Sequence, residues 1–242
     1  MSGVWVLLVI ILISSLPVIA VYVWFRLAKY QFSSYRLLFA LLAGAAAFFP
    51  ALILQDMFTV SFQSNRAALF FNYFVRIALT EELSRLLILI IFFWISSRIT
   101  KDGQPFSFNT IKKAAATGLV AGLGFALIEN AAYAASDIGV LPLRIIITAA
   151  VHAACGSRIG AAAVLLRRSP LNALLRILTA TAIHGIFNMM IIMPGISPLA
   201  AILLAICALF TAILIILGGW SETAKPSKAE TAAFQDEKKP LA

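Results

Sequence analysis

The sequence predicts an all-α fold, a polytopic transmembrane bundle of about seven helices. Hydrophobic residues fill 62% of the 242 positions and charged residues only 12%, and the mean hydropathy is +0.99. So few charges could not solvate the surface of a soluble domain of this size. A transmembrane β-barrel would alternate apolar and polar residues, whereas residues 203–210 are apolar at every position. Helices are therefore the expected way to satisfy the backbone in lipid.

Seven stretches are long enough to cross a membrane, which takes about 20 largely apolar helical residues. In chain order, these predicted spans are 4–25, 37–55, 69–95, 111–135, 141–166, 171–193 and 196–219. The short junction 194–198 leaves a re-entrant turn open, so the count could reach eight. We take residues 1–219 as one transmembrane domain. Residues 220–242 are rich in Ala, Lys, Glu and Pro and are expected to form a disordered polar tail.

Individual spans carry further signals. The first has no basic residue before it and exceeds the roughly 7–15 apolar residues of a signal-peptide core, so we expect it to be retained. The fourth and fifth carry glycines four residues apart, Gly118 with Gly122 and Gly156 with Gly160. This spacing lets helix backbones approach closely in lipid. Both cysteines lie inside spans, so a disulfide framework is not expected.

Basic residues alternate between rich and poor connections along the chain. Successive connections hold Arg26, Lys29 and Arg36; then Arg66; then Arg98, Lys101, Lys112 and Lys113; then Arg144; then Arg167 and Arg168; and then none. Because loops rich in Lys and Arg stay in the cytoplasm, the pattern predicts an N-terminus outside and a cytoplasmic C-terminus. The net charge of +9 is then mostly a topology signal. No Lys/Arg run or basic-aromatic patch indicates a nucleic-acid partner.

Acidic residues are scarce, and half of those before the tail lie inside predicted spans. The three intramembrane acids are Glu81, Glu82 and Glu129, and both histidines of the chain, His152 and His184, also lie in spans. A charged residue near the bilayer centre costs roughly 2.5–3.5 kcal/mol on insertion scales, so intramembrane acids and histidines are candidate functional groups. At 1.5 Å per residue, all five lie roughly 9–20 Å from the outer ends of their helices. We expect them to converge on one wet polar cavity.

The third span contains the pattern Glu81-Glu82-x-x-Arg85. Helical neighbours lie three and four residues apart, so Arg85 can reach both carboxylates. The guanidinium can neutralise one carboxylate while the other stays available for proton chemistry. A structural ion pair that locks helices together is the alternative interpretation.

The next three spans each add polar groups. Glu129 precedes Asn130 and has no basic residue within four positions, so its partner must come from another helix or it must be protonated. His152 lies alone among small residues, where a packing role is the alternative. His184 and Asn188 are four residues apart and share a helix face.

Four motifs in this order, on these helices, carry a family resemblance. They are Glu81-Glu82-x-x-Arg85, Phe125-x-x-x-Glu129-Asn130, the isolated His152, and His184-Gly-x-x-Asn188. Over roughly residues 69–193 the chain resembles the PrsW-type intramembrane proteases, whose wider superfamily includes CAAX prenyl endopeptidases and bacteriocin-processing or immunity proteins. The prenyl proteases have one more residue before the arginine and a histidine at the position of Glu129. These differences count against a prenylated substrate.

The resemblance implies an endopeptidase of the cell membrane, such as the bacterial plasma membrane. Its expected partners are the lipid bilayer and a membrane-embedded substrate, a single-pass protein such as an anti-sigma factor. By carry-over, Glu81 assisted by Glu82 would be the general base that activates water. His184 and Asn188 would orient that water or stabilise the oxyanion, and His152 would be a further proton or hydrogen-bond partner.

The resemblance also assigns supporting roles. Arg85 would hold the glutamate pair, and Phe125, Glu129 and Asn130 would complete the shell around it. In this glutamate-dependent mechanism no cofactor is expected.

Several alternatives stay open. Two histidines and a glutamate also form a hydrolytic zinc set, although the chain has no His-Glu-x-x-His helix. Cys155 follows His152 by three residues and is an alternative nucleophile. A non-catalytic scaffold that binds partner helices through these polar groups is a further class. A transporter is the last, and the missing internal repeat counts against it.

Overall fold

The computed structural model describes residues 3–30, 32–58, 66–99, 111–193 and 198–218. Every regular element in these ranges is helical, and no strand occurs among them. The elements are α1 (Gly3–Ser14), α2 (Leu16–Leu27), α3 (Ser34–Met57), α4 (Arg66–Phe70), η1 (Phe71–Leu79), α5 (Thr80–Ile99), α6 (Ile111–Ser136), η2 (Ile138–Val140), α7 (Leu141–Leu143), η3 (Arg144–Thr148), α8 (Ala149–Leu165), α9 (Pro170–Ile192) and α10 (Pro198–Leu217). Two of them, η1 and η3, are π-helical, and η2 is a 3₁₀ turn.

In the part of the chain that the structure describes, six helical stretches are long and apolar enough to cross a membrane. They are Leu8–Leu27, Ser34–Met57, Ile111–Ser136, Leu141–Leu165, Pro170–Ile192 and Pro198–Leu217. The seventh predicted span, 69–95, lies in the uninterrupted helical run of α4, η1 and α5. This run is also long enough to cross, and the three charged residues Glu81, Glu82 and Arg85 near its centre set it apart from the other six. The predicted all-α, multi-pass membrane fold is confirmed.

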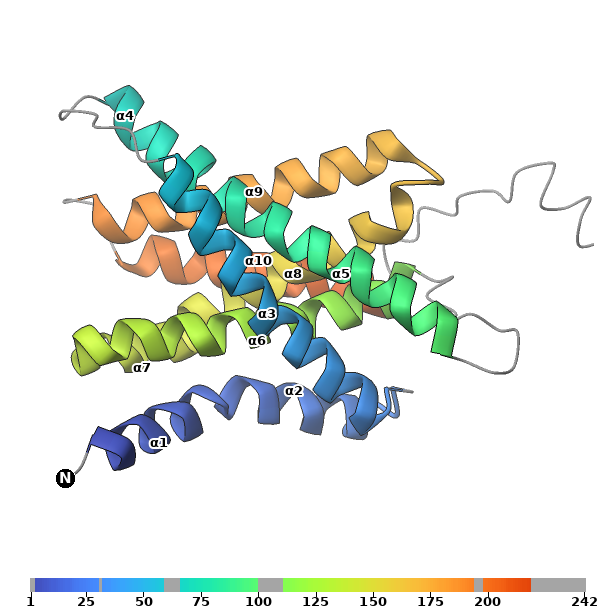
Figure 1. Ribbon diagram of the computed structural model, residues 1–242, viewed down its shortest axis with the longest axis horizontal. Helices are drawn as coiled ribbons and strands as arrows, with labels where there is room; N and C mark the ends of the chain where they lie inside the picture. The colour runs from blue at the N-terminus through green and yellow to red at the C-terminus, as the bar shows by residue number, and fades with distance from the viewer. Residues whose placement is uncertain (1–2, 31, 59–65, 100–110, 194–197, 219–242) are drawn as a thin grey trace, which may run out of the picture.

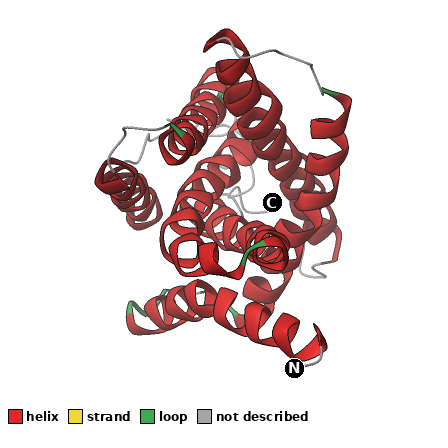
Figure 2. Cartoon of the chain, turned by 90° about the vertical axis from the view of Figure 1, so that its left-hand side faces the viewer, coloured by secondary structure: helices red, strands yellow, loops and turns green. Residues whose placement is uncertain are grey.

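The long helices run side by side in one bundle. Figure 1 shows α3 crossing obliquely over α6, and Figure 2, turned by 90°, shows many of the helices nearly end-on. The side of the membrane on which each terminus lies stays a prediction. The predicted tail, 220–242, and residues 194–197 of the junction lie outside the described residues. The helix that follows the junction, α10, is 20 residues long, as a full span requires.

Short polar residues and prolines set several helix ends. Ser33 caps α3, because its Oγ accepts a hydrogen bond from the Arg36 amide at 3.3 Å. Pro170 begins α9, where its missing N–H would have had no intrahelical acceptor. Asp137 Oδ1 accepts from the Gly139 amide at 2.8 Å and so stabilises the tight turn after α6.

Paired glycines allow α6 and α8 to pack backbone against backbone, as their spacing predicts. A Cβ at Gly118 would lie 2.1 Å from the carbonyl oxygen of Gly156, and one at Gly156 would lie 2.3 Å from the oxygen of Gly118. A Cβ at Gly122 would lie 2.0 Å from the oxygen of His152. No side chain fits at these distances, so glycine is required for this approach. The contact places His152 directly against α6.

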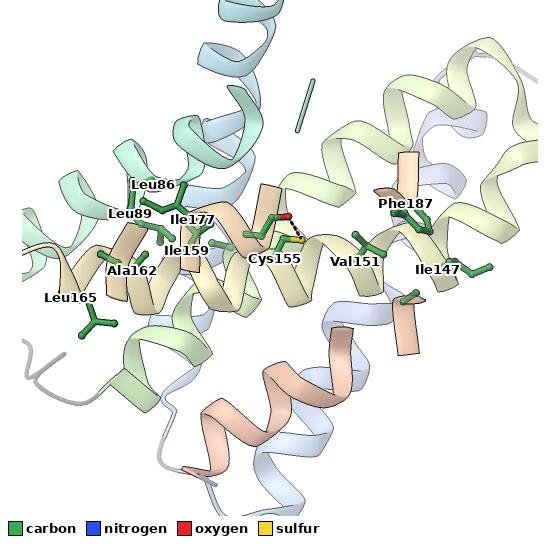
Figure 3. Packing of buried hydrophobic residues seen from close by; sticks show 14 of the residues in the cluster. Leu86, Leu89, Ile147, Val151, Cys155, Ile159, Ala162, Leu165, Ile177 and Phe187 are labelled. Carbon is green, nitrogen blue, oxygen red and sulfur yellow. Dashed lines mark hydrogen bonds between the residues drawn. The ribbon is translucent and has the colours of Figure 1, made fainter. Parts of the chain in front are cut away.

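Helix α8 lies at the centre of the bundle. The stretch Leu141–Leu165 contains α8, and 83% of an 18-residue apolar segment within it is buried. In Leu8–Leu27 the buried share of such a segment is 17%. Figure 3 shows the apolar cluster along α8, with Val151, Cys155 and Ile159 packed against residues of α5 and α9. Both cysteines are free thiols, as predicted. The polar residues carried by α8 are therefore enclosed by protein on all sides.

Candidate active site

Glu81 and Glu82 lie in the first turn of α5, directly after the π-helical segment η1. Both are almost completely buried, and so is Arg85, with 4%, 0% and 1% of their surfaces exposed. Arg85 Nη2 lies 2.8 Å from Glu82 Oε1 and 3.5 Å from Glu81 Oε2. Arg85 therefore reaches both carboxylates, as the spacing predicts, but it pairs closely with Glu82. The other carboxylate, Glu81, is held less tightly.

His184 of α9 contacts both glutamates through its two ring nitrogens. Nδ1 lies 2.8 Å from Glu82 Oε1 and Nε2 lies 3.7 Å from Glu81 Oε2. The Glu82 carboxylate is paired with Arg85 and accepts, so the imidazole proton is on Nδ1. Nε2 then carries a lone pair on the side of Glu81. Glu81 Oε2 is itself buried and accepts no hydrogen bond from any described residue.

His152 of α8 lies between Arg85 and Glu129. Its Nδ1 is 3.2 Å from Arg85 Nη2 and its Nε2 is 2.8 Å from Glu129 Oε2. A guanidinium can only donate, so Nδ1 accepts and the proton of neutral His152 is on Nε2, donated to Glu129. The ring of His152 packs 4.9 Å from that of His184, nearly perpendicular to it. The isolated histidine of the sequence is thus part of the glutamate cluster.

Phe125 packs against the charged groups from the side of α6. Its ring lies 4.6 Å below the guanidinium carbon of Arg85 and 5.3 Å from the ring of His152. A cation over an aromatic face is stabilised by the ring quadrupole, more so where water is excluded. Phe125 is 1% exposed, so it also seals this side of the site.

Glu129 finds its partners on the following helices, as predicted from the lack of a basic residue near it. Besides His152, Arg144 of η3 pairs with it, with Nη2 2.7 Å from Oε2. Arg144 Nε also donates to Asn130 Oδ1 at 3.1 Å, and its guanidinium carbon lies 3.8 Å from the centre of the Tyr133 ring. One arginine therefore holds Glu129 and Asn130 together. From the sequence, Arg144 was expected only as the basic residue of a connection between spans, and no pattern indicated this role.

Gln55 is a second contact that the sequence analysis missed. Its Nε2 donates to Glu81 Oε1 at 3.1 Å, and its backbone oxygen accepts from Arg76 Nε at 2.9 Å. Gln55 lies near the end of α3, where a polar residue is unremarkable in a sequence. Its hydrogen bond fixes one oxygen of Glu81 and leaves the other, Oε2, directed toward His184.

Three of these residues form a compact donor cluster. Ligand atoms of Glu81, His152 and His184 all lie within 4.8 Å of one another, and all three residues are buried. A carboxylate and two imidazoles are a common ligand set for catalytic zinc, which leaves a fourth position for water.

Comparison with known proteins identifies the family. The model of the PrsW family, described as intramembrane metalloproteases, matches residues 33–217. The chain belongs to the PrsW family. The match includes the 69–193 region on which the sequence resemblance was based, and extends beyond it on both sides. Searches of the curated proteins and of the solved structures found no significant match.

PrsW membership indicates an intramembrane protease, and the four sequence motifs are brought together unevenly. Glu81, Glu82, Arg85, His152 and His184 form one connected cluster, extended by Phe125, Glu129 and Asn130. In contrast, Asn188 is half-buried one turn beyond His184, and none of the hydrogen bonds found among the described residues involves its side chain. Its predicted role beside the water stays a prediction.

Cys155 lies apart from this PrsW cluster. Its Sγ donates to the Ala180 carbonyl oxygen at 3.4 Å, and the residue is fully buried in the apolar cluster shown in Figure 3. The contact is typical of a packing residue. Nothing in these surroundings favours a nucleophilic thiol.

The donor set of the PrsW site fits a metal ion. Ligands about 2.1 Å from zinc at tetrahedral angles lie roughly 3.4 Å apart, whereas two acceptors sharing one water at about 2.8 Å lie roughly 4.6 Å apart. The 3.7 Å between Glu81 Oε2 and His184 Nε2 is closer to the first value. The three donor atoms as a set lie within 4.8 Å of one another, a range that includes both values. The buried Glu81 oxygen also accepts no hydrogen bond from a described residue, and its ion pair with Arg85 is long at 3.5 Å, which a bound cation would offset. A metal-free reaction, expected from the sequence, stays untested.

Proposed function

We propose that the protein is an intramembrane endopeptidase that uses water activated between Glu81, His152 and His184 to hydrolyse a peptide bond. The observation that carries this proposal is the 3.7 Å separation of Glu81 Oε2 and His184 Nε2 inside a buried, charge-paired cluster. Glu81 Oε2 is buried and accepts no hydrogen bond within the described part of the chain, so a proton, a water or a cation between it and the imidazole nitrogen would satisfy it. In the hydrolysis of an amide, a proton can be passed to the leaving group, a water can attack the carbonyl carbon, and a cation can polarise the carbonyl.

The residues around the cluster fix the two reacting side chains. Glu82, neutralised by Arg85, holds the Nδ1 proton of His184 and so keeps the lone pair of Nε2 on the side of Glu81. Gln55 holds Oε1 of Glu81, so Oε2 is the oxygen that takes the proton from water. Because these groups are buried, water screens their charges only weakly, and they interact strongly with the charge that develops in the transition state.

His152 is oriented from both sides. Arg85 donates to its Nδ1 and Glu129 accepts from its Nε2, so its ring cannot turn without breaking a charge-assisted contact. A second role, either as a ligand or as a hydrogen-bond donor to the carbonyl oxygen under attack, requires one of these two contacts to open first. Arg144 and Asn130 support this orientation through Glu129.

A divalent metal ion, with zinc as the first candidate, fits the same three donors. When bound, it would supply Lewis acidity to the water and to the scissile carbonyl. The fit of the 3.7 Å separation and the description of the PrsW family favour the metal-dependent form over the metal-free, glutamate-dependent one.

We further propose that the substrate is a single-pass membrane protein. The site lies among transmembrane helices and is almost completely buried, so a substrate must enter from the lipid as a membrane segment or as a chain at its edge. An anti-sigma factor is the example that the family resemblance suggests.

Purified protein in detergent, incubated with a single-span substrate, tests the proposal. We expect a cleavage product from the native protein and none from Glu81→Gln. The matched control is Asp137→Asn, another carboxyl-to-amide change, at an exposed turn where Asn also caps. Loss of cleavage with a chelator and recovery with zinc would establish the metal-dependent form, whereas cleavage in chelator would establish the glutamate-dependent one. If His184→Ala weakens a protein complex while no product ever forms, the chain is a scaffold.

A further inference from the structure

A basic cavity lies at the other end of α6 from the candidate active site. It has a volume of about 560 Å³ and lies where the end of α2, the start of α3 and the start of α6 meet. Its basic lining residues are Arg26, Lys29, Arg36 and Lys113, and none of the residues that line it is acidic. Lys113 lies 16 positions before Glu129, roughly 24 Å along the helix at 1.5 Å per residue. The cavity is therefore separate from the peptidase site.

The structure around this cavity favours an anion. Ser33 caps the N-terminus of α3, and Lys113 lies in the first turn of α6, so two long helices direct the positive ends of their dipoles toward this region, while α2 directs its negative end there. Arg26, Lys29 and Lys113 lie together among lining residues none of which is acidic. Like charges repel, which a bound anion would offset.

The Tyr30 hydroxyl is a buried donor beside the cavity, and a ligand reaches it only when the side chains that cover it shift. It lines the cavity, its oxygen is buried, and it has no hydrogen-bond partner among the described residues. Burial raises the pKa of Tyr30, so the hydroxyl stays protonated and can donate. The ring is fixed by its neighbours, with centroids 5.1 Å from Phe25 and 6.4 Å from Phe32. The donor is therefore held in place before any ligand binds.

The position of the cavity identifies the kind of anion. It lies at the ends of apolar membrane helices, and Leu27 and Leu38, which flank it in sequence, are 78% and 51% exposed. A ligand with an anionic head and apolar chains matches both the basic cavity and the exposed leucines, because its head can enter the cavity while its chains lie on the leucines. We infer that this cavity binds the phosphate headgroup of an anionic phospholipid. The predicted topology places it in the cytoplasmic leaflet, where anionic lipids are found.

Lipid binding to the full-length protein tests the inference. The protein is held in a neutral detergent, so no anionic surface competes, and phosphatidylglycerol or phosphatidylcholine is titrated with native mass spectrometry as the readout. We expect saturable binding of phosphatidylglycerol and much weaker binding of phosphatidylcholine. Lys29→Gln/Lys113→Gln should weaken phosphatidylglycerol binding about 30-fold, from the contribution of each basic residue to binding an anionic lipid. Tyr30→Phe should weaken it about tenfold through the lost hydrogen bond to a charged group.

The control is Arg66→Gln/Arg167→Gln, which removes the same charge at exposed positions outside the cavity. It should change binding by less than about twofold. Lys29→Arg/Lys113→Arg keeps the charge and should retain binding, which separates loss of charge from loss of folding. Displacement of the lipid by inorganic phosphate at equal concentration would assign the phosphate site to a soluble ligand instead. Equal binding of the two lipids, or equal losses in cavity and control variants, would overturn the inference.

Discussion

Oε2 of Glu81 lies 3.7 Å from Nε2 of His184, and both side chains are almost completely buried. The partners of the two residues explain why these atoms meet without bonding to each other. Glu82 holds the other nitrogen of His184, and Gln55 holds the other oxygen of Glu81. Oε2 of Glu81 and Nε2 of His184 are thus directed at a common point by Gln55 of α3 and Glu82 of α5. The first predictions follow from this arrangement.

Glu81→Gln should abolish proteolysis without unfolding the protein. The amide can still accept from Gln55, but it cannot take a proton from water, a step that contributes typically 10²–10⁴-fold to rate. We expect kcat to fall by about this factor while the melting temperature in detergent stays near that of the native protein. Kinetics with a single-span substrate measure kcat, and a thermal melt measures the melting temperature. Native-like kcat in this variant would remove Glu81 from the mechanism.

Arg85→Ala should unfold the protein more readily than Glu81→Gln does. The change leaves Glu82 buried, with 0% of its surface exposed and His184 as its remaining partner. Removing one member of a buried ion pair costs about 3–5 kcal/mol. A denaturation titration in mixed micelles measures the loss. The control is Arg26→Ala, whose exposed guanidinium bonds only to the Tyr22 hydroxyl among the described residues and whose removal should cost far less.

Metal content should depend on His184. If a metal ion is held by the three donors, the native protein purified with zinc should retain close to one ion per chain by elemental analysis, and His184→Ala should retain little. Cys207→Ser is the control, since it removes an exposed free thiol that can bind zinc adventitiously. Equal zinc in native and His184→Ala protein would assign the ion to another site and leave the glutamate-dependent mechanism in place.

Arg144→Gln should lower activity through Glu129 and His152. Arg144 touches neither Glu81 nor His184, but it pairs with Glu129 at 2.7 Å, and Glu129 orients His152. Loss of such an outer partner typically costs 10–100-fold in activity or metal affinity. We expect a fall of this size in kcat, with partial recovery in Arg144→Lys. Arg66→Gln, in the other predicted connection with one basic residue, should leave kcat unchanged. An equal effect of both changes would indicate a general charge effect.

Arg144 and Gln55 also show where prediction from the sequence ends. The spans and the converging acids and histidines were predictable, because lipid excludes polar groups and thus makes each of them informative. Arg144 and Gln55 lie at the ends of membrane segments, where polar residues are common and carry no such signal. Their contacts depend on how α3 and η3 are placed against α5 and α6, which is a tertiary property. The predicted Asn188 shared a helix face with His184, but a shared face did not bring it into a hydrogen bond.

Gly118→Ala should destabilise the bundle at the contact that places His152. The new Cβ would lie 2.1 Å from the Gly156 carbonyl oxygen, and its nearest atoms all belong to backbone, so α6 and α8 must separate. Overpacking of this kind costs about 1–3 kcal/mol or more. A lower melting temperature in detergent should accompany reduced proteolysis, because separation of these helices also moves His152 from Phe125 and Glu129. Gly139→Ala is the matched control, since its nearest atom, 3.1 Å away, belongs to the Asp137 side chain, which can move. Equal melting temperatures for the two variants would show that the α6–α8 contact adapts to a methyl group.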